Sequence, residues 1–273
     1  MIPKLIHYSW FSNEPFPEHI QELISTWKQH LPDYEFVLWD MKKLEETKCT
    51  FALEAASVRK WAFAADFIRL YAVYHYGGIW LDTDIEMFKS FDPYLQHKMF
   101  IGREWYTHEY GPQLAYLTSH CFGAEKGHPF LKDCLSYYQD RHFIGCYNED
   151  LPQSLRYDMT IIPKIQATIA AYKYGFDWRE SVDKHQVLKE DIHVYPHDYF
   201  DAPGYSNMGN VVCIHRASGG WRPGNENNVP DYSFTSHHKN GIVYYADKII
   251  NGFLQIFKMR IIRCDNNKIV NIK

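Results

Sequence analysis

The 273-residue chain lacks three features that would indicate its class directly: a basic charge excess, a long apolar run and a close cysteine pair. Its formal net charge of −4 gives no indication of a nucleic-acid partner. No window approaches the roughly 18 apolar residues of a membrane-spanning helix. The first residues, MIPKLIHYSWF, show no basic stretch followed by an apolar run, so no signal peptide is expected. We therefore predict a cytoplasmic protein.

The six cysteines include no CxxC pair, which argues against a zinc knuckle or a thioredoxin-type motif. Reduced thiols are expected in such a chain. The sequence also contains no internal repeat, no low-complexity segment and no obvious linker. We predict one domain over 1–240 and a tail over 241–273.

Aromatic residues are abundant, with 21 Tyr, 17 Phe and 8 Trp. Proteins that handle sugars or nucleotide bases use aromatic rings as platforms, but a plain aromatic core also accounts for this content. Composition alone favours the core.

The order of apolar patterns predicts an α/β fold with a mainly parallel sheet. Strands over 4–10 and 34–40 flank a helix over 18–30, as a βαβ unit requires. The longest helix is expected over 54–76, where apolar residues recur every three or four positions. The glycine pair 77–78 ends it, and a strand in IWLDTD follows. Further helices are expected over 129–139 and in TIIPKIQATIAAYKYG, and further strands in IHVYPHDYF and NVVCIHR.

Asp82 and Asp84 stand at the end of this strand, with Thr83 between them. Strand alternation places both acids on the same face as Trp80. Hard divalent cations take oxygen ligands, and ligands of open α/β sheets bind beyond the carboxyl ends of strands. The pair therefore indicates a metal-phosphate site, although a solvated turn is the commoner meaning of an isolated DxD.

Asp66 and Arg69 interrupt the apolar helix that precedes this strand. They lie at i and i+3, so their side chains are neighbours. A surface salt bridge, worth about 0.3–0.5 kcal/mol, and a functional pair are both open readings.

Three segments, IPKLIHYSWF, FAADFIRLYAVYHYGGIWLDTDI and IHRASGGW, resemble glycosyltransferase family 32, the sugar transferases with a DXD motif. The resemblance implies a GT-A fold, a Rossmann-like α/β domain that binds a nucleotide-sugar. It implies a retaining transferase in which Asp82 and Asp84 hold Mn²⁺ or Mg²⁺ against the donor diphosphate. Asp66 and Arg69 would bind the donor sugar hydroxyls, with Arg69 also near the phosphate.

The same resemblance implies four further site residues. Trp10 would stack on the nucleotide base, and Trp80 would belong to the nucleotide-sugar site. His215 and Trp221 would lie in a loop that closes over the diphosphate, with His215 as a third metal ligand. Two departures from the family pattern leave the donor contacts open: Ala65 replaces a common Ser, and Ser119-His120 occupy a region that often carries Asn.

The implied function is transfer of a hexose, from a UDP-sugar in preference to a GDP-sugar, to a glycan or lipid-linked acceptor. Relatives that build bacterial capsule, O-antigen and lipopolysaccharide suggest such an acceptor. A nucleotide-sugar hydrolase with the same metal site is one alternative. A carbohydrate- or nucleotide-binding module without catalysis is the other.

The segment 243–263 reads as an amphipathic helix with cations towards its end. Such a helix can lie on an anionic membrane, which would make the protein peripheral on the cytoplasmic leaflet. It can equally pack on the catalytic domain. Two isolated residues are expected to be structural. Asp40 is expected to cap the end of a strand, with an approach to the nucleoside as the alternative, and His7 is expected to be a hydrogen-bonded core histidine.

Overall fold

The computed structural model describes residues 1–12, 14–104, 116–201 and 209–216. All of them fall within one compact unit, Met1–Asn228. None of the helices described there combines the length and apolarity that a bilayer crossing requires. Trp221 and the whole predicted tail over 241–273 lie outside these ranges, so the membrane and packing alternatives for 243–263 stay predictions.

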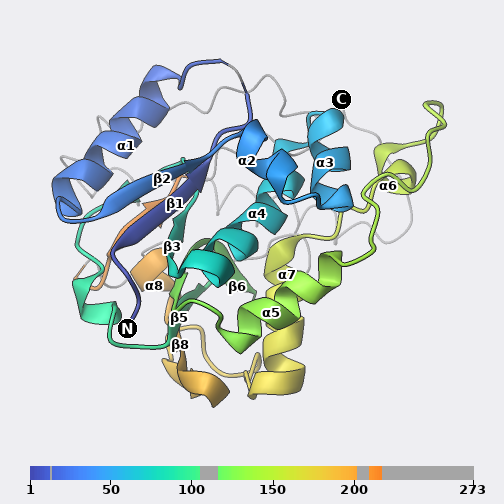
Figure 1. Cartoon of the computed structure of the whole chain (residues 1–273). Helices are drawn as coiled ribbons and strands as arrows, with labels where there is room; N and C mark the ends of the chain where they lie inside the picture. Colours follow the sequence, from blue (N-terminus) through green and yellow to red (C-terminus); the bar gives the residue numbers. More distant parts are fainter. Residues whose placement is uncertain (13, 105–115, 202–208, 217–273) are drawn as a thin grey trace, which may run out of the picture. The chain divides into compact units, whose positions relative to one another are not determined.

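A seven-stranded sheet in the order β2-β1-β3-β6-β5-β8-β7 forms the centre of the fold (Figure 1). Parallel pairing joins β1 to β2, β1 to β3 and β5 to β8, whereas β6 and β7 run antiparallel to their neighbours. A second, two-stranded sheet pairs β4 with β9. The strands are β1 (Leu5–Ser9), β2 (Glu35–Trp39), β3 (Gly78–Leu81), β4 (Ile85–Met87), β5 (Met99–Arg103), β6 (Leu117–Ala124), β7 (Gln186–Leu188), β8 (Ile192–Tyr195) and β9 (Cys213–His215).

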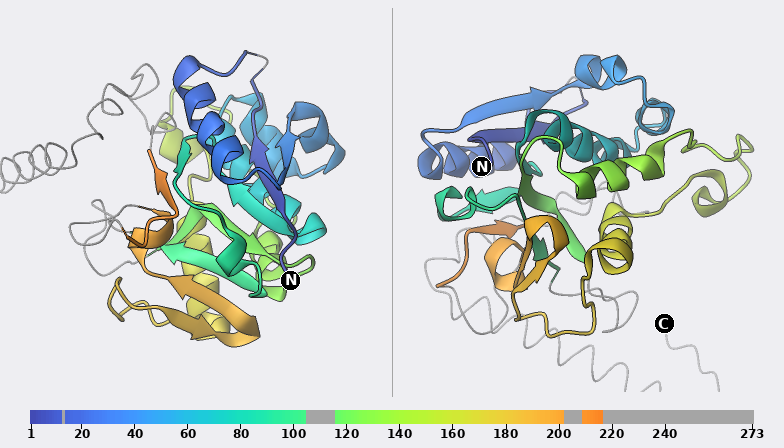
Figure 2. Two further views of the ribbon diagram at one scale, coloured as in Figure 1. Left: turned by 90° about the vertical axis from the view of Figure 1, so that its left-hand side faces the viewer. Right: turned by 60° about the horizontal axis from the view of Figure 1, so that its bottom comes forward.

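Helices cover both faces of the large sheet (Figures 1 and 2). One apolar core packs α3, α4, α5 and α7 against one face, and a second packs α1 and α8 against the other. The helices are α1 (Glu18–His30), α2 (Met41–Glu46), α3 (Thr50–Ser57), α4 (Trp61–Tyr76), α5 (Pro129–Leu135), α6 (Gln153–Arg156), α7 (Ile162–Ile169) and α8 (His197–Phe200), with short helical turns η1 (Asp92–Tyr94), η2 (Ser136–Tyr138), η3 (Ala170–Tyr174) and η4 (Lys189–Asp191). The predicted α/β fold with a mainly parallel central sheet is confirmed, since only β6 and β7 run opposite to the other strands of the large sheet.

Side-chain alternation along β3 explains why two cores form. Trp80 belongs to the core on the α4 side, whereas Ile79 and Leu81 belong to the core on the α1 side. All four residues of β3 are buried, which is the pattern of a central strand covered on both faces. The strand therefore holds the residues that follow it in a fixed position.

Two predictions about the segment before the acids need correction. The helix expected over 54–76 is two helices, α3 and α4, separated at Arg59, whose φ of 58° is left-handed. The strand expected through IWLDTD ends at Leu81, so alternation does not place the two acids. The Ile85 amide donates to the Asp82 carbonyl at 3.1 Å, and Asp82–Asp84 form a turn instead.

The glycine pair at the end of α4 has the positive φ that its position predicts, 70° at Gly77 and 105° at Gly78. A Cβ at Gly78 would lie 2.7 Å from the Leu5 carbonyl oxygen. The missing side chain thus lets β3 begin directly beside β1.

Asp40 and His7 both have structural contacts, as expected. The Asp40 carboxylate accepts from the Lys43 amide at 3.0 Å, and it caps the start of α2. The His7 ring is buried between the Gly77 carbonyl, 2.8 Å from Nε2, and the Trp39 indole, which donates to Nδ1 at 3.2 Å.

Candidate functional site

The acidic turn lies at the carboxyl end of β3. The Asp82 amide donates to the His120 carbonyl on neighbouring β6 at 2.9 Å, which ties the turn to the sheet. The chain then continues into β4, and there Ile85 pairs with His215 of β9. This pairing brings a distant part of the sequence back to the two acids.

Asp82, Asp84 and His215 form one cluster. One ligand atom of each lies within 4.8 Å of the other two. His215 Nε2 stands 3.3 Å from Asp84 Oδ1. The structure therefore brings together the three residues that were predicted to hold a metal.

A buried ion-pair network supports this cluster from α4. Arg69 Nη2 lies 3.1 Å from Asp66 Oδ1 and 3.4 Å from Asp82 Oδ1. The Arg69 side chain is 5% exposed and that of Asp66 is 12% exposed, so the surface salt bridge is not what the structure shows. The guanidinium also donates to the carbonyl oxygens of Ser119 at 2.8 Å and Ala65 at 3.2 Å. These bonds fix a positive charge beside the acids.

Asp66 has an unusual protonation equilibrium. Burial raises the pKa of its carboxyl group, Arg69 lowers it and Asp82 raises it again, which leaves the pKa at about 7. Near neutral pH the group can therefore accept a hydrogen bond in one form and donate in the other.

Trp80 contacts the acidic turn through Asp82. Its ring is completely buried, and its Nε1 donates to Asp82 Oδ1 at 2.6 Å. The Arg69 guanidinium lies over the same ring at 5.6 Å from the centroid. A ring with no exposed surface has none to offer to a nucleotide-sugar, so in this structure Trp80 positions Asp82 and Arg69 rather than touching a ligand.

His120 and Asp201 complete the surroundings of His215. The His120 ring stacks on that of His215 with centroids 4.1 Å apart, and its Nε2 lies 3.0 Å from the Phe200 carbonyl oxygen and 3.6 Å from Asp201 Oδ1. The sequence marked His120 only as a departure from a family pattern. Asp201 belongs to no sequence motif, and its contact with His120 depends on the turn after α8.

The two stacked histidines have opposite pKa shifts. Burial lowers the pKa of His120 to about 3, with a further lowering from His215. Burial also lowers the pKa of His215, but Asp84, Asp82 and Asp201 outweigh it and raise the pKa to about 9. The cluster therefore concentrates negative charge at the position of His215.

Trp10 lies at the carboxyl end of β1, the strand beside β3. Its side chain is half-buried, it donates to the Glu14 carbonyl at 2.8 Å, and its ring lies 4.8 Å from that of Phe16. Part of the ring remains available to a ligand at the same edge of the sheet as the acids. Base stacking on Trp10 stays a prediction.

The donor set suits a divalent cation. Two carboxylates and an imidazole converge, and carboxylate oxygens are preferred by Mg²⁺ and Mn²⁺. The same acids raise the pKa of His215 against the effect of burial, as expected for a position of negative potential.

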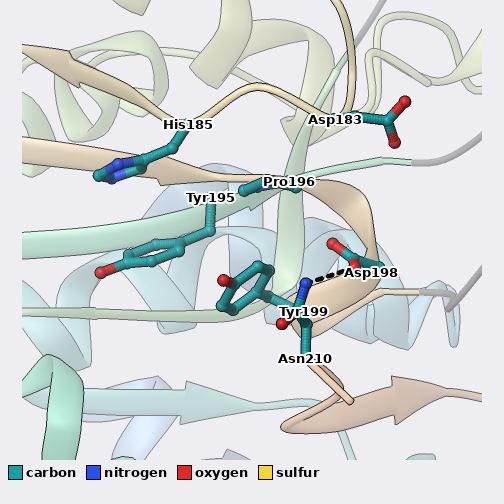
Figure 3. Close-up of a pocket in the computed structure, with 7 residues that line it drawn as sticks. All are labelled: Asp183, His185, Tyr195, Pro196, Asp198, Tyr199 and Asn210. Carbon is teal, nitrogen blue, oxygen red and sulfur yellow. Dashed lines mark hydrogen bonds between the residues drawn. The ribbon is translucent and has the colours of Figure 1, made fainter. Parts of the chain in front are cut away.

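A separate cavity of about 490 Å³ contains none of these residues (Figure 3). Its walls come from the loop before β7, the end of β8, α8 and the approach to β9, and the Asn210 amide donates to Asp198 there at 2.9 Å. The lining residues are Asp183, His185, Tyr195, Pro196, Asp198, Tyr199 and Asn210.

Comparison with known proteins confirms the family resemblance that the sequence suggested. Residues 17–101, which include α4 and the acidic turn, match the family model described as "Glycosyltransferase sugar-binding region containing DXD motif". The match covers the part of the chain that contains Asp66, Arg69, Asp82 and Asp84.

Curated relatives are fungal. Inositol phosphoceramide mannosyltransferase 3 of Schizosaccharomyces pombe is 34% identical over 134 residues, which cover 48% of this chain and 35% of that protein. Mannosyl phosphorylinositol ceramide synthase of Saccharomyces cerevisiae is 28% identical over 139 residues, which cover 50% of this chain and 34% of that protein. The similarity thus spans about a third of the length of these relatives.

Two solved structures to which the chain is similar are named as glycosyltransferases. PaToxG glycosyltransferase has a TM-score of 0.42 at 18% identity and covers 62% of this chain and 69% of its own. The galactosyltransferase LgtC, solved with donor and acceptor sugar analogues, has a TM-score of 0.43 at 12% identity and covers 83% of this chain and 98% of its own.

Proposed function

We propose that this protein is a metal-dependent, retaining glycosyltransferase that moves a hexose from a nucleotide-sugar to a glycan or lipid-linked acceptor. The observation that carries the proposal is the convergence of Asp82, Asp84 and His215 beside the buried Arg69. The match to the DXD sugar-binding region supports the reaction class.

The metal would be held by Asp84 and His215 most directly. Oδ1 of Asp82 already accepts from Trp80 and faces Arg69, so this acid has less freedom to reorient. When bound, a divalent ion would supply Lewis-acid stabilisation of the charge that grows on the departing diphosphate.

Arg69 would supply a second, permanent positive charge on the same side. Its bonds to Ser119, Ala65 and Asp66 fix the guanidinium before any ligand arrives, so little reorganisation is needed during the reaction. Asp66, with a pKa near 7, can hydrogen-bond a donor sugar hydroxyl in either protonation state.

In the proposed reaction the bond from the anomeric carbon to the phosphate oxygen breaks. A bond from that carbon to the acceptor oxygen forms on the same face of the sugar. The acceptor hydroxyl proton passes to the departing phosphate oxygen. No protein base is then required, and the described part of the site contributes fixed charges and hydrogen bonds.

The donor and acceptor are proposed from two sources. The sequence resemblance favours a UDP-hexose, whereas the curated relatives are named for mannose transfer to inositol phosphoceramide. Mannose is therefore tested beside glucose and galactose, and an inositol sphingolipid beside oligosaccharide acceptors. A capsule or O-antigen acceptor on the cytoplasmic side stays a prediction.

The test is product formation by the full chain with GDP-mannose, UDP-glucose or UDP-galactose, each with Mn²⁺, Mg²⁺ or a chelator. We expect one donor to give equal amounts of nucleoside diphosphate and glycoside with metal, and neither with chelator. NMR of the product would show a retained anomeric configuration. Metal-dependent release of sugar without glycoside would indicate the hydrolase, and absence of metal-dependent turnover with every donor and acceptor would overturn the proposal.

A further inference from the structure

A second group of histidine and carboxylate side chains lies away from the candidate active site. His97 precedes β5, Asp191 directly precedes β8, and His193 is the second residue of β8. Since β5 and β8 are parallel, this group lies at the amino ends of these two strands, whereas the acidic turn follows the carboxyl end of β3. One ligand atom from each of the three residues lies within 4.8 Å of the others.

Direct contacts hold the three side chains of this group together. His193 Nε2 lies 3.1 Å from Asp191 Oδ1, and the rings of His97 and His193 stack with centroids 3.6 Å apart. The other carboxylate oxygen, Oδ2, accepts from the Lys98 amide at 2.9 Å. Asp191 is thus oriented by the backbone and keeps Oδ1 towards the imidazole.

The backbone before β8 adopts an uncommon conformation to achieve this. Glu190 and Asp191 have φ values of 61° and 57°, in the left-handed region that side chains other than glycine rarely adopt. Strained backbone is often retained where it positions a functional group. Here it directs the Asp191 carboxylate back towards Lys98 and His193.

Outer partners orient both imidazoles. His193 Nδ1 lies 3.2 Å from His185 Nε2, and His97 Nε2 lies 2.9 Å from the Tyr195 hydroxyl. His185 and Tyr195 stack with centroids 4.6 Å apart at the edge of the cavity (Figure 3). Metal-binding histidines commonly use their second nitrogen in this way, and such outer bonds fix the ring orientation.

We propose that His97, Asp191 and His193 form a second metal site, which binds Zn²⁺ or a similar borderline cation through two imidazoles and one carboxylate. This ligand set is known for zinc, with water at the remaining position, and imidazole suits Zn²⁺ better than Mg²⁺. The Asp191 side chain is 42% exposed and that of His193 is 14% exposed, so a cation can enter from solvent. In the bound state Nε2 of His193 would coordinate the cation, while Nδ1 faces His185.

The role that follows is structural. A cation at this position joins the segment before β5 to the turn before β8 and to β8 itself. It would stabilise the outer half of the large sheet without touching Asp82 or Asp84. This inference does not depend on the proposed transferase activity.

The test uses the tag-free full chain carrying Asp82→Asn, Asp84→Asn and His215→Gln, so that neither the acidic turn nor the adjoining group of His120, Asp201 and His215 keeps its full ligand set. After chelator dialysis, calorimetry should show one equivalent of Zn²⁺ with a micromolar or tighter dissociation constant. Co²⁺ should give the intense visible absorption of a four- or five-coordinate site. Adding His97→Gln or His193→Asn should weaken Zn²⁺ binding at least about tenfold, whereas adding His30→Gln, on α1, should not.

Two results would overturn the proposal: no Zn²⁺ bound, or equal affinity in the His30, His97 and His193 variants. Should His193→Asn fail to fold, Asp191→Asn replaces it, because that side chain is partly exposed. Loss of zinc affinity in Asp191→Asn supports the site, and unchanged affinity contradicts it.

Discussion

The acidic turn and the histidine cluster use similar residues at opposite edges of one sheet, and they differ in what surrounds them. Beside Asp82 lies the guanidinium of Arg69, fixed by buried hydrogen bonds. Asp191 instead accepts from the backbone amide of Lys98 and faces the His193 imidazole. A cluster backed by a fixed cation can bind an anion together with a metal, which is what a nucleotide-sugar diphosphate requires.

The balance of ligands differs as well. Two acids and one histidine suit a hard cation such as Mg²⁺ or Mn²⁺, whereas two histidines and one acid suit a borderline cation such as Zn²⁺. The two clusters should therefore prefer different cations, even though their residue types overlap. The following experiments test whether the two clusters act independently.

The largest effect is expected from Asp84→Asn. This change removes a charged ligand at nearly constant size, so kcat/KM should fall at least about 100-fold, equivalent to roughly 2.7 kcal/mol of barrier. Zinc affinity of the histidine cluster should be unchanged, and Asp40→Asn, which keeps a helix cap, should retain full activity. Turnover near that of the wild type in Asp84→Asn would contradict the assignment of Asp84 as a metal ligand.

The core histidine His7 provides a reference that belongs to neither cluster. Burial lowers its pKa to about 4. The hydrogen bond to Gly77 opposes this shift, and the charge of Lys43 adds to it. Because the folded state binds the proton less readily than the unfolded state, stability is fully present above about pH 6.5 and is lost as pH falls towards 4. At pH 5 this histidine alone should cost about 2 kcal/mol of unfolding free energy.

Denaturant titrations of wild type and His7→Gln at pH 7 and pH 5 measure this effect. Other groups also titrate, so the informative quantity is the difference between the two proteins. We expect that difference to shrink by about 2 kcal/mol on acidification. A pH-independent difference would show that His7 is not a buried neutral imidazole.

Trp80→Phe should have an intermediate effect that is confined to the acidic turn. Phenylalanine keeps the buried ring but removes the donor to Asp82, and a hydrogen bond to a charged group is worth about 1.5–3 kcal/mol. The Mn²⁺ concentration for half-maximal activity should rise about tenfold, with kcat changed less. If only thermal stability changes, Trp80 is a packing residue and has no positioning role.

The smallest expected effect is on stability through the histidine cluster. Zn²⁺ at about five times its dissociation constant should stabilise the folded chain by about 1 kcal/mol, or roughly 2–4 °C in melting temperature. His193→Asn should abolish this shift and leave transferase activity within about twofold. A matching loss of activity would mean that the two clusters are coupled.

The sequence was informative where one residue type had one physical meaning. The apolar periodicity of 18–30 and the glycine pair at 77–78 each predicted their place correctly, because local geometry determines them. Periodicity could not show the break at Arg59, since apolar residues continue on both sides of it.

What the sequence could not show is proximity across the chain. The sequence alone placed Trp80 in the nucleotide-sugar site, because neither its burial nor its hydrogen bond to Asp82 can be known without the structure. Asp201 and His120 meet His215 only because β9 pairs with β4. The histidine cluster likewise depends on the parallel pairing of β5 with β8, which no short motif encodes.

The most direct test of the account is the affinity of a nucleoside diphosphate for the protein, measured by calorimetry with and without Mn²⁺. We predict that Mn²⁺ strengthens binding at least about tenfold in the wild type, which corresponds to 1.4 kcal/mol, and gives no gain in Asp84→Asn. The same affinity with and without Mn²⁺, or an equal gain in Asp84→Asn, would contradict the assignment of the acidic turn as the metal-diphosphate site.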